Sequence, residues 1–267
     1  MPRYRFLSML VGTVLAVASA ALPARAEQFE IVHTTWVGYG PLYLAQDLGY
    51  FKEEGVDVKL TTIEEKSLQM AAVMSGKVAA ALGTVDEFLL YMNKDVCLHY
   101  VLALDESSGG DGIIALQDIK SLADLKGKQV AFNEGSVSQF WFNVLLKQQG
   151  MSQSDIQTVN MTADDAAAAF MADRVPAAVT WEPHLTEARN NPKGHVLVDS
   201  SSTPGVITDV VAVLCDTAEK RGNEIKAVVR AGTAPSTTGR RIRRNRTRSW
   251  PRAWVVGLPI LPCSATR

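Results

Sequence analysis

Cysteine and histidine are both scarce in this sequence. Its 267 residues include three cysteines (Cys97, Cys215 and Cys263) and four histidines scattered along the chain. A disulfide-rich scaffold or a structural metal site needs such residues at short, regular separations, and these spacings provide neither. Because 47% of the residues are hydrophobic, we expect a fold that is stabilised by an apolar core, without a metal site.

The motifs of three enzyme classes are missing as well. No G-x-G-x-x-G opens a helix, as a dinucleotide enzyme requires, and no G-x-S-x-G provides a serine nucleophile. A cysteine enzyme of this kind of fold would need a thiol in its first loop, where Thr35 and Trp36 stand. We therefore expect no catalytic residues and no cofactor, and we predict that the protein is not an enzyme.

Only the N-terminus contains a long apolar run. Arg3 and Arg5 precede an uncharged segment from Phe6 to Leu22, and Ala24-Arg25-Ala26 offers the small residues that a signal peptidase reads. The alternative is a membrane anchor, but a run of roughly 17 residues is shorter than the ~20 that a spanning helix needs. We expect residues 1–26 to be a cleaved signal peptide and the mature protein to be periplasmic.

Basic residues are unevenly distributed. Eight arginines and no acidic residue lie in 232–267, whereas all 28 acidic residues lie between Glu27 and Ala231. The formal net charge of −1 therefore conceals a strongly acidic body, which argues against nucleic acid as a ligand.

The arginine-rich tail does not continue the pattern that precedes it. Ile225, Val228 and Val229 give a helical stripe that stops at Ala231. A basic arm and a disordered tail are two interpretations. We favour a third, a frameshift, because codons for the residues from Ala231 onward can encode a helical, charge-balanced segment in another frame. On that hypothesis 232–267 is aberrant, and the DNA sequence tests it.

Strand and helix patterns alternate from Phe29 onward. A strand over 29–34, a helix over 41–51 and a strand over 56–61 begin a series of βα units, which predicts α/β architecture with open parallel sheets. Polar, glycine-containing stretches interrupt the series near 105–111 and 203–209. We expect two lobes hinged at these two crossings, lobe 1 from 27–107 and 205–231 and lobe 2 from 108–204.

Five segments of the chain carry a family resemblance. They are Trp36–Ala45, Leu48–Val58, Ile119–Lys128, Glu134–Ser136 and Thr180–Pro183. They resemble the solute-binding proteins of ABC importers in the sulfonate, nitrate, taurine and thiamine-precursor branch. The resemblance spans about 29–231 and implies the type II periplasmic-binding-protein fold, with the family's C-terminal helices missing from this chain.

The same resemblance implies a function and partners. The protein would capture a small nitrogen- or sulfur-containing solute, such as a sulfonate, taurine or nitrate, and deliver it to an ABC permease and its ATPase. It would be a monomer that meets the membrane only through the permease. The alternatives are a pyrimidine-precursor or guanidino-compound binding protein, and a periplasmic sensory module. The cysteine cluster of the family's pyrimidine-synthesising relatives is absent.

Candidate ligand-binding residues follow the predicted strands, because ligands of open α/β sheets bind beyond the carboxyl ends of the strands. We select Trp36, Gly38, Tyr39, Thr84, Asp86, Asp105, Ser107, Ser108, Glu134, Ser136, Trp181 and Glu182.

These residues suggest different ligand chemistries. The aromatic rings would enclose an apolar part of the solute, and the helix start at Glu134–Ser136 would attract an anion. Asp86, Asp105, Asp111 and Glu182 instead favour a cationic or N–H-donating ligand. The alternatives are core packing for the aromatic rings, an N-cap for Ser136, hinge roles for the two serines and solvated surface positions for the carboxylates. The family's topology would also place Cys97 and Cys215 side by side, which leaves a disulfide and two free thiols as the options.

Overall fold

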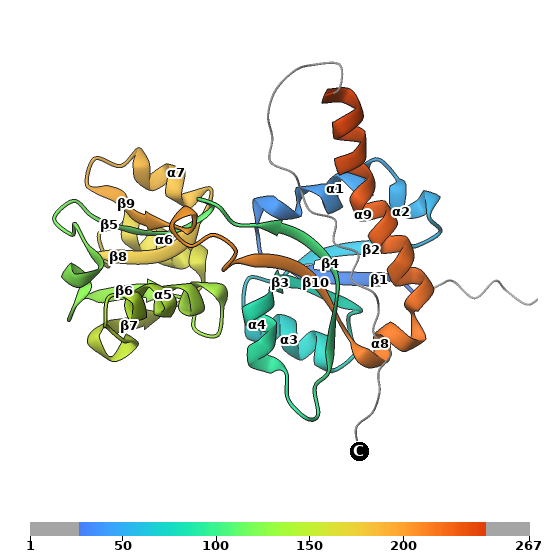
Figure 1. The fold of residues 1–267 in the computed structure, drawn as a ribbon, viewed down its shortest axis with the longest axis horizontal. Coiled ribbons are helices and arrows are strands. Elements are labelled where there is room, and N and C mark those ends of the chain that lie inside the picture. Colours follow the sequence, from blue (N-terminus) through green and yellow to red (C-terminus); the bar gives the residue numbers. More distant parts are fainter. Residues whose placement is uncertain (1–26, 244–267) are drawn as a thin grey trace, which may run out of the picture.

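The computed structural model describes residues 27–243, and the side chains of 27–235. The expected signal peptide and the tail beyond Arg243 lie outside the described residues. Within them the chain forms two α/β lobes side by side, each built around one five-stranded sheet (Figure 1). The expected two-lobed α/β class is therefore confirmed.

Lobe 1 contains the first and last parts of the described chain. Its sheet has the order β2 (Val58–Thr62), β1 (Phe29–His33), β3 (Ala80–Thr84), β10 (Thr208–Leu214) and β4 (Leu98–Glu106). Its helices are α1 (Gly40–Asp47), α2 (Tyr50–Glu53), α3 (Lys66–Met74), α4 (Val85–Tyr91), α8 (Cys215–Lys220) and α9 (Gly222–Arg243).

Lobe 2 contains the middle of the chain. Its sheet has the order β7 (Gln157–Asn160), β6 (Gln129–Phe132), β8 (Ala177–Trp181), β5 (Asp111–Leu116) and β9 (Gly194–Asp199). Its helices are α5 (Val137–Gln148), α6 (Ala163–Met171) and α7 (His184–Arg189). The central strands β3 and β8 are buried along their whole length, which explains why both read as continuous apolar runs.

Both sheets are mixed, although the sequence predicted parallel ones. β1 pairs in parallel with β2 and β3, whereas β10 is antiparallel to both β3 and β4. In lobe 2, β5 is likewise antiparallel to β8 and β9. β4 leads the chain out of lobe 1 and β10 brings it back (Figure 1), so these two neighbouring strands must run in opposite directions.

The two crossings are joined to each other. The Ser107 hydroxyl on the outgoing crossing lies 2.8 Å from that of Ser200 on the return. The Ser200 hydroxyl also accepts the Gly109 N–H at 2.8 Å, and the Ser107 N–H donates to the Ile207 carbonyl at 3.0 Å. These hydrogen bonds make the two crossings a single connected hinge.

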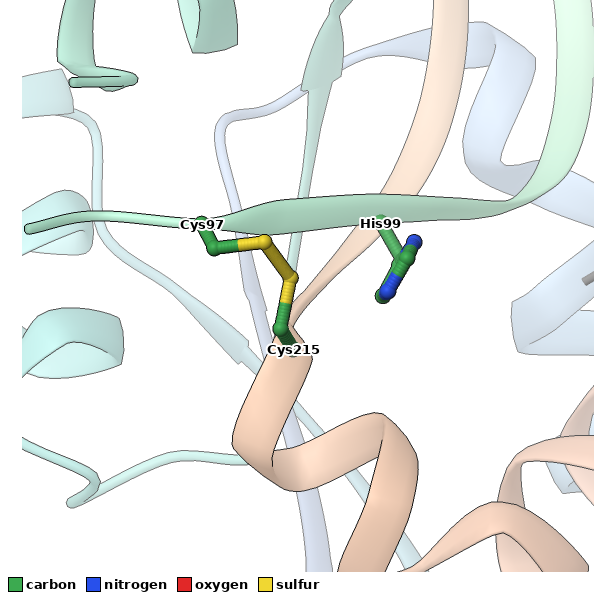
Figure 2. Close-up of side chains that lie close together, drawn as sticks. All are labelled: Cys97, His99 and Cys215. Atoms are coloured by element: carbon green, nitrogen blue, oxygen red, sulfur yellow. A yellow bond between two sulfur atoms is a disulfide. The ribbon is translucent and has the colours of Figure 1, made fainter. Parts of the chain in front are cut away.

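A disulfide joins Cys97 to Cys215 inside lobe 1 (Figure 2). It ties the start of β4 to the start of α8, with the two Cα atoms 5.5 Å apart. His99 lies near both sulfur atoms. Because each sulfur is bonded to the other, neither is a free thiolate that could hold a metal with this imidazole.

Helix boundaries differ from expectation at two places. The helix predicted over 41–51 is interrupted at Gly49, whose φ of +81° lies in the left-handed region that glycine tolerates. The helix expected to stop near Ala231 continues as α9 to Arg243, with Pro235 inside it. Ala231 is fully buried, and α9 packs along α1 and α2. No helix among the described residues is long and apolar enough to cross a membrane.

Candidate functional site

A cleft lies between the lobes where strands from both sheets end. It has about 290 Å³ of empty space, including the part open to solvent. The lining residues come from both lobes and from the return crossing: Thr34, Trp36, Tyr39, Thr84, Glu87, Asp111, Val137, Trp181, Ile207 and Asp209. The cleft is therefore the place where a solute would contact both lobes at once.

Three aromatic side chains form the walls of this cleft. The half-buried Trp36 packs against the apolar cores of both lobes, and its indole N–H donates to Asp105 at 3.2 Å. The Trp181 indole N–H of lobe 2 donates to the Thr35 carbonyl of lobe 1 at 2.9 Å. The buried Tyr39 hydroxyl donates to Asp209 Oδ1 at 2.7 Å. The polar group of each ring is thus hydrogen-bonded, which fixes the position of the ring at the wall of the cleft.

Glycine allows Trp36 its position. A Cβ at Gly38 would collide with the Asp105 carboxylate and the Trp36 indole, and one at Gly110 would collide with the far edge of the same ring. The sequence proposed Gly38 because it follows a predicted strand, and the structure adds this steric reason. Gly110 plays the same role from the opposite crossing.

Three aspartates gather beside these rings. Asp105 and Asp209 are direct partners across β4 and β10, and Asp111 opens β5. Burial raises the pKa of Asp105 to about 6 and that of Asp111 to about 7. It also raises the pKa of Asp209 well above its usual value, and the nearby charge of Asp105 adds to that shift. Burial thus favours the neutral acid form of all three carboxyl groups relative to water.

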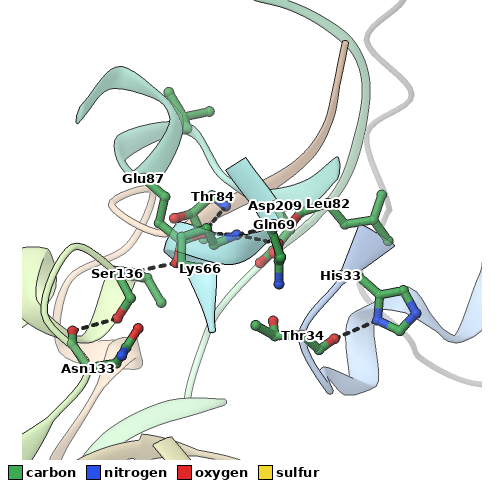
Figure 3. A network of polar contacts seen from close by, with 12 residues as sticks. His33, Thr34, Lys66, Gln69, Leu82, Thr84, Glu87, Asn133, Ser136 and Asp209 are labelled. Atoms are coloured by element: carbon green, nitrogen blue, oxygen red, sulfur yellow. Dashed lines mark hydrogen bonds and ion pairs between the residues drawn. The ribbon is translucent and has the colours of Figure 1, made fainter. Parts of the chain in front are cut away.

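A different carboxylate in the cleft is fully compensated. Glu87 is 4% exposed and forms an ion pair of 2.8 Å with Lys66, which is 1% exposed (Figure 3). Its other oxygen accepts the Val137 N–H at 3.0 Å, so the pair also joins lobe 1 to the first turn of α5. Lys66 Nζ donates in addition to Gln69 and to the Leu82 carbonyl.

The comparison with protein families is decisive for the classification. The model of the family described as NMT1/THI5-like matches residues 36–234. The chain belongs to the NMT1/THI5-like family. The resemblance that the sequence segments carry is thereby confirmed.

Individual members of this branch are distant from the chain. A binding protein of Brucella abortus is 23% identical over 202 residues, which are 76% of this chain and 62% of the relative. A thiamine biosynthesis protein of Haemophilus influenzae is 24% identical over 161 residues, covering 59% and 50%. The chain thus spans about three fifths of the length of the Brucella relative it matches.

Solved structures show the same fold. The periplasmic aliphatic sulphonate binding protein of Escherichia coli superposes with a TM-score of 0.64 at 23% identity, covering 83% of this chain and 76% of that one. At this identity the similarity establishes the two-lobed fold and leaves the ligand to be argued from the cleft itself.

Several residues proposed from the sequence do line the cleft or touch its walls. Trp36, Tyr39, Thr84 and Trp181 line it, and Gly38 and Asp105 lie against Trp36. Ser107 is buried in the hinge through its contact with Ser200, and Ser108 is exposed on the same crossing.

Four other proposed residues lie outside the cleft lining. Glu134 is exposed, and Ser136 caps α5 by accepting the Ser138 N–H at 3.2 Å. Glu182 forms an ion pair of 2.6 Å with Arg189. Partial burial opposes ionisation of Glu182, but the hydrogen bonds from Arg189 and Thr186 prevail and lower its pKa. Asp86 lies buried in the first turn of α4, where burial raises its pKa to about 6.

Sequence reasoning missed Asp209, Glu87 and Lys66. The sequence analysis assigned Asp209 to the return crossing. Its position directly before an apolar strand was a signal that could have identified it, because an aspartate is rarely buried without a function. Lys66 and Glu87 sit in the first turns of two amphipathic helices, where charged residues are normally solvated. Nothing local distinguishes them from surface positions.

Proposed function

We propose that this family member is the extracytoplasmic solute-binding component of an ABC importer. It captures one small organic solute in the interlobe cleft and releases it, chemically unchanged, to a permease that is driven by an ATPase. The site of action is the periplasm. The names of relatives and structural neighbours as binding proteins support a role in binding rather than catalysis.

The observation that carries this proposal is the pairing of the lobes around the cleft. Trp181 of lobe 2 bonds to the Thr35 carbonyl of lobe 1, and Glu87 of lobe 1 accepts the Val137 N–H of lobe 2. Each lobe has its own apolar core, and within residues 27–243 the chain passes between the lobes at two crossings. Such an arrangement can open at the hinge and close again on a solute.

A ligand screen tests the proposal. The purified chain is heated with sulfonates, taurine, nitrate, pyrimidines and guanidino compounds, and a true ligand raises the melting temperature by mass action. The hit is then titrated against Trp36→Ala, which removes one wall of the cleft and should weaken binding by about tenfold or more. Val37→Ala, at the neighbouring position whose side chain is 64% exposed, should leave the affinity unchanged.

Two results would contradict this function. An unchanged affinity in Trp36→Ala would show that the solute binds elsewhere. Recovery of a chemically altered compound after incubation, seen by NMR of the released solute, would make the protein an enzyme.

A further inference from the structure

The charge of the cleft bears on the kind of solute that it accepts. Glu87, Asp111 and Asp209 line the cleft and Asp105 lies directly beside it, while no Lys, Arg or His is among the lining residues. The buried Lys66 forms its ion pair with Glu87, at 2.8 Å. Asp105, Asp111 and Asp209 therefore have no basic partner within 4 Å among residues 27–235.

The arrangement of these aspartates is unfavourable in the empty protein. Asp105 and Asp209 occupy directly opposed positions on adjacent antiparallel strands, where like charges destabilise a sheet. Asp111 and Asp209 are only 5% and 4% exposed, so water screens their repulsion poorly. Their hydrogen bonds come from neutral donors, such as the Tyr39 hydroxyl to Asp209. A bound cation would offset the repulsion between these carboxylates.

Other features of the cleft favour an organic cation over a metal ion. Within the described part of the chain, the three carboxylates do not converge closely enough to hold one metal ion. The rings of Trp36, Tyr39 and Trp181 stand around the same space, and aromatic faces attract organic cations. The Thr84 hydroxyl, at the N-cap of α4, also lines the cleft.

We propose that the solute is a small organic cation with several N–H donors, such as an amidinium, a guanidinium or a protonated amine, and that Asp105, Asp111 and Asp209 neutralise it. This inference rests on the proposed function. It narrows the range of candidate solutes to nitrogen-containing cations, such as the guanidino compounds named above. We expect sulfonates and nitrate to bind poorly, because each ionised carboxylate in this poorly solvated cleft repels an anion.

Calorimetric titration with matched probes tests the charge rule. Acetamidinium and guanidinium supply charge and planar N–H groups, tetramethylammonium supplies charge without N–H, and ethanesulfonate and nitrate supply the opposite charge. All are titrated as chloride or sodium salts at one ionic strength. We expect acetamidinium and guanidinium to bind, tetramethylammonium to bind at least tenfold more weakly, and the anions to give no signal.

Asparagine variants locate the binding. Asp111→Asn and Asp209→Asn keep the size of each side chain and should weaken acetamidinium binding at least tenfold. The exposed Asp47→Asn serves as the matched control and should bind as the unaltered chain does. Because each cluster variant removes a repulsive charge, its melting temperature without ligand should be equal or higher, which separates lost binding from lost folding.

The outcomes discriminate between the two proposals. Binding of ethanesulfonate or nitrate with higher affinity than the cations would overturn the charge inference and leave the solute-binding function intact. Saturable binding of Ca²⁺ or Zn²⁺ that the asparagine variants abolish would replace the organic cation with a metal. If no probe and no compound of the wider screen binds, both proposals fail.

Discussion

Glu87 and the three aspartates Asp105, Asp111 and Asp209 lie in or beside the cleft, and they differ in whether a basic side chain pairs with them. Glu87 is buried beside Lys66 and receives two backbone N–H donors, from Thr84 and Val137. Asp105, Asp111 and Asp209 lie among rings and hydroxyl groups, and no basic side chain of residues 27–235 forms an ion pair with them. The charge of Glu87 is compensated by Lys66. On our proposal, the charges of the three aspartates are compensated by the ligand.

This difference separates structural from functional charge. A buried ion pair with all its hydrogen bonds positions its surroundings, here β3, α3, α4 and the first turn of α5 (Figure 3). Unpaired buried carboxylates reduce the stability of the empty protein, and sequences that violate a local rule in this way do so at functional sites. Four substitutions or changes of condition test the contrast.

The largest effect is expected from Lys66→Met. Removing the lysine leaves Glu87 buried without its counter-ion, which should lower the free energy of unfolding by about 3–5 kcal/mol. Urea denaturation measures the loss. The exposed pair of Lys59 and Glu30, also 2.8 Å apart, provides the control, because Lys59→Met should cost less than about 1 kcal/mol. Equal losses in the two variants would show that burial adds nothing to the importance of the Lys66–Glu87 pair.

The disulfide offers a comparison outside the cleft. It closes a loop with a sequence separation of 118, and the double variant Cys97→Ser, Cys215→Ser should lose about 2–4 kcal/mol of stability. Because neither cysteine lines the cleft, the affinity for the ligand found in the screen should not change. A fall in affinity at a temperature where the variant is folded would show that the disulfide also shapes the site.

The acidic cluster should make stability depend on pH. The pKa of Asp111 is raised from 3.8 to about 7 and that of Asp105 to about 6, so the folded state binds these protons more tightly than the unfolded state. Their stabilising effect is full below pH 4 and disappears as the pH rises through 6 to 7.

The melting temperature of the ligand-free protein should therefore fall between pH 5 and pH 8 by an amount that corresponds to a few kcal/mol. Asp86, Glu87, Lys66 and Tyr39 also face the cluster or act on it electrostatically. Asp111→Asn isolates the contribution of one carboxylate and should flatten the dependence. A variant with the same slope as the unaltered chain would assign the effect to other groups.

The smallest effect is expected from Trp181→Phe. The substitution keeps an aromatic wall and removes the N–H that bonds to the Thr35 carbonyl across the lobes. We expect a loss of about 0.5–1.5 kcal/mol in ligand affinity, the usual contribution of one hydrogen bond. An unchanged affinity by calorimetry would show that this contact is not needed for closure.

The sequence predicted the order of elements and the lobes better than the site. The strand predicted over 29–34 is observed as Phe29–His33, because most of its residues are buried. Trp36 and Tyr39 were found because they follow a strand. Asp209 was missed because its role depends on pairing with Asp105, about a hundred positions earlier in the chain. No local sequence pattern indicates the contact between Asp105 and Asp209.

Glu182 and Ser136 illustrate the opposite limitation. Both follow strands at the correct end of the sheet, yet Glu182 turns to Arg189 and Ser136 caps α5. Position in the chain indicates which residues can reach a cleft. The tertiary structure determines which partner each of these side chains contacts.

Proton exchange on binding tests the central claim most directly. Acetamidinium is titrated into the protein at pH 6.5 in buffers with different ionisation enthalpies, and the slope of the binding enthalpy gives the protons exchanged. A cation that neutralises Asp105, Asp111 and Asp209 lowers their pKa values, so we predict that protons are released. Proton uptake, or no proton exchange at all, would contradict the claim that these three carboxylates neutralise a bound cation.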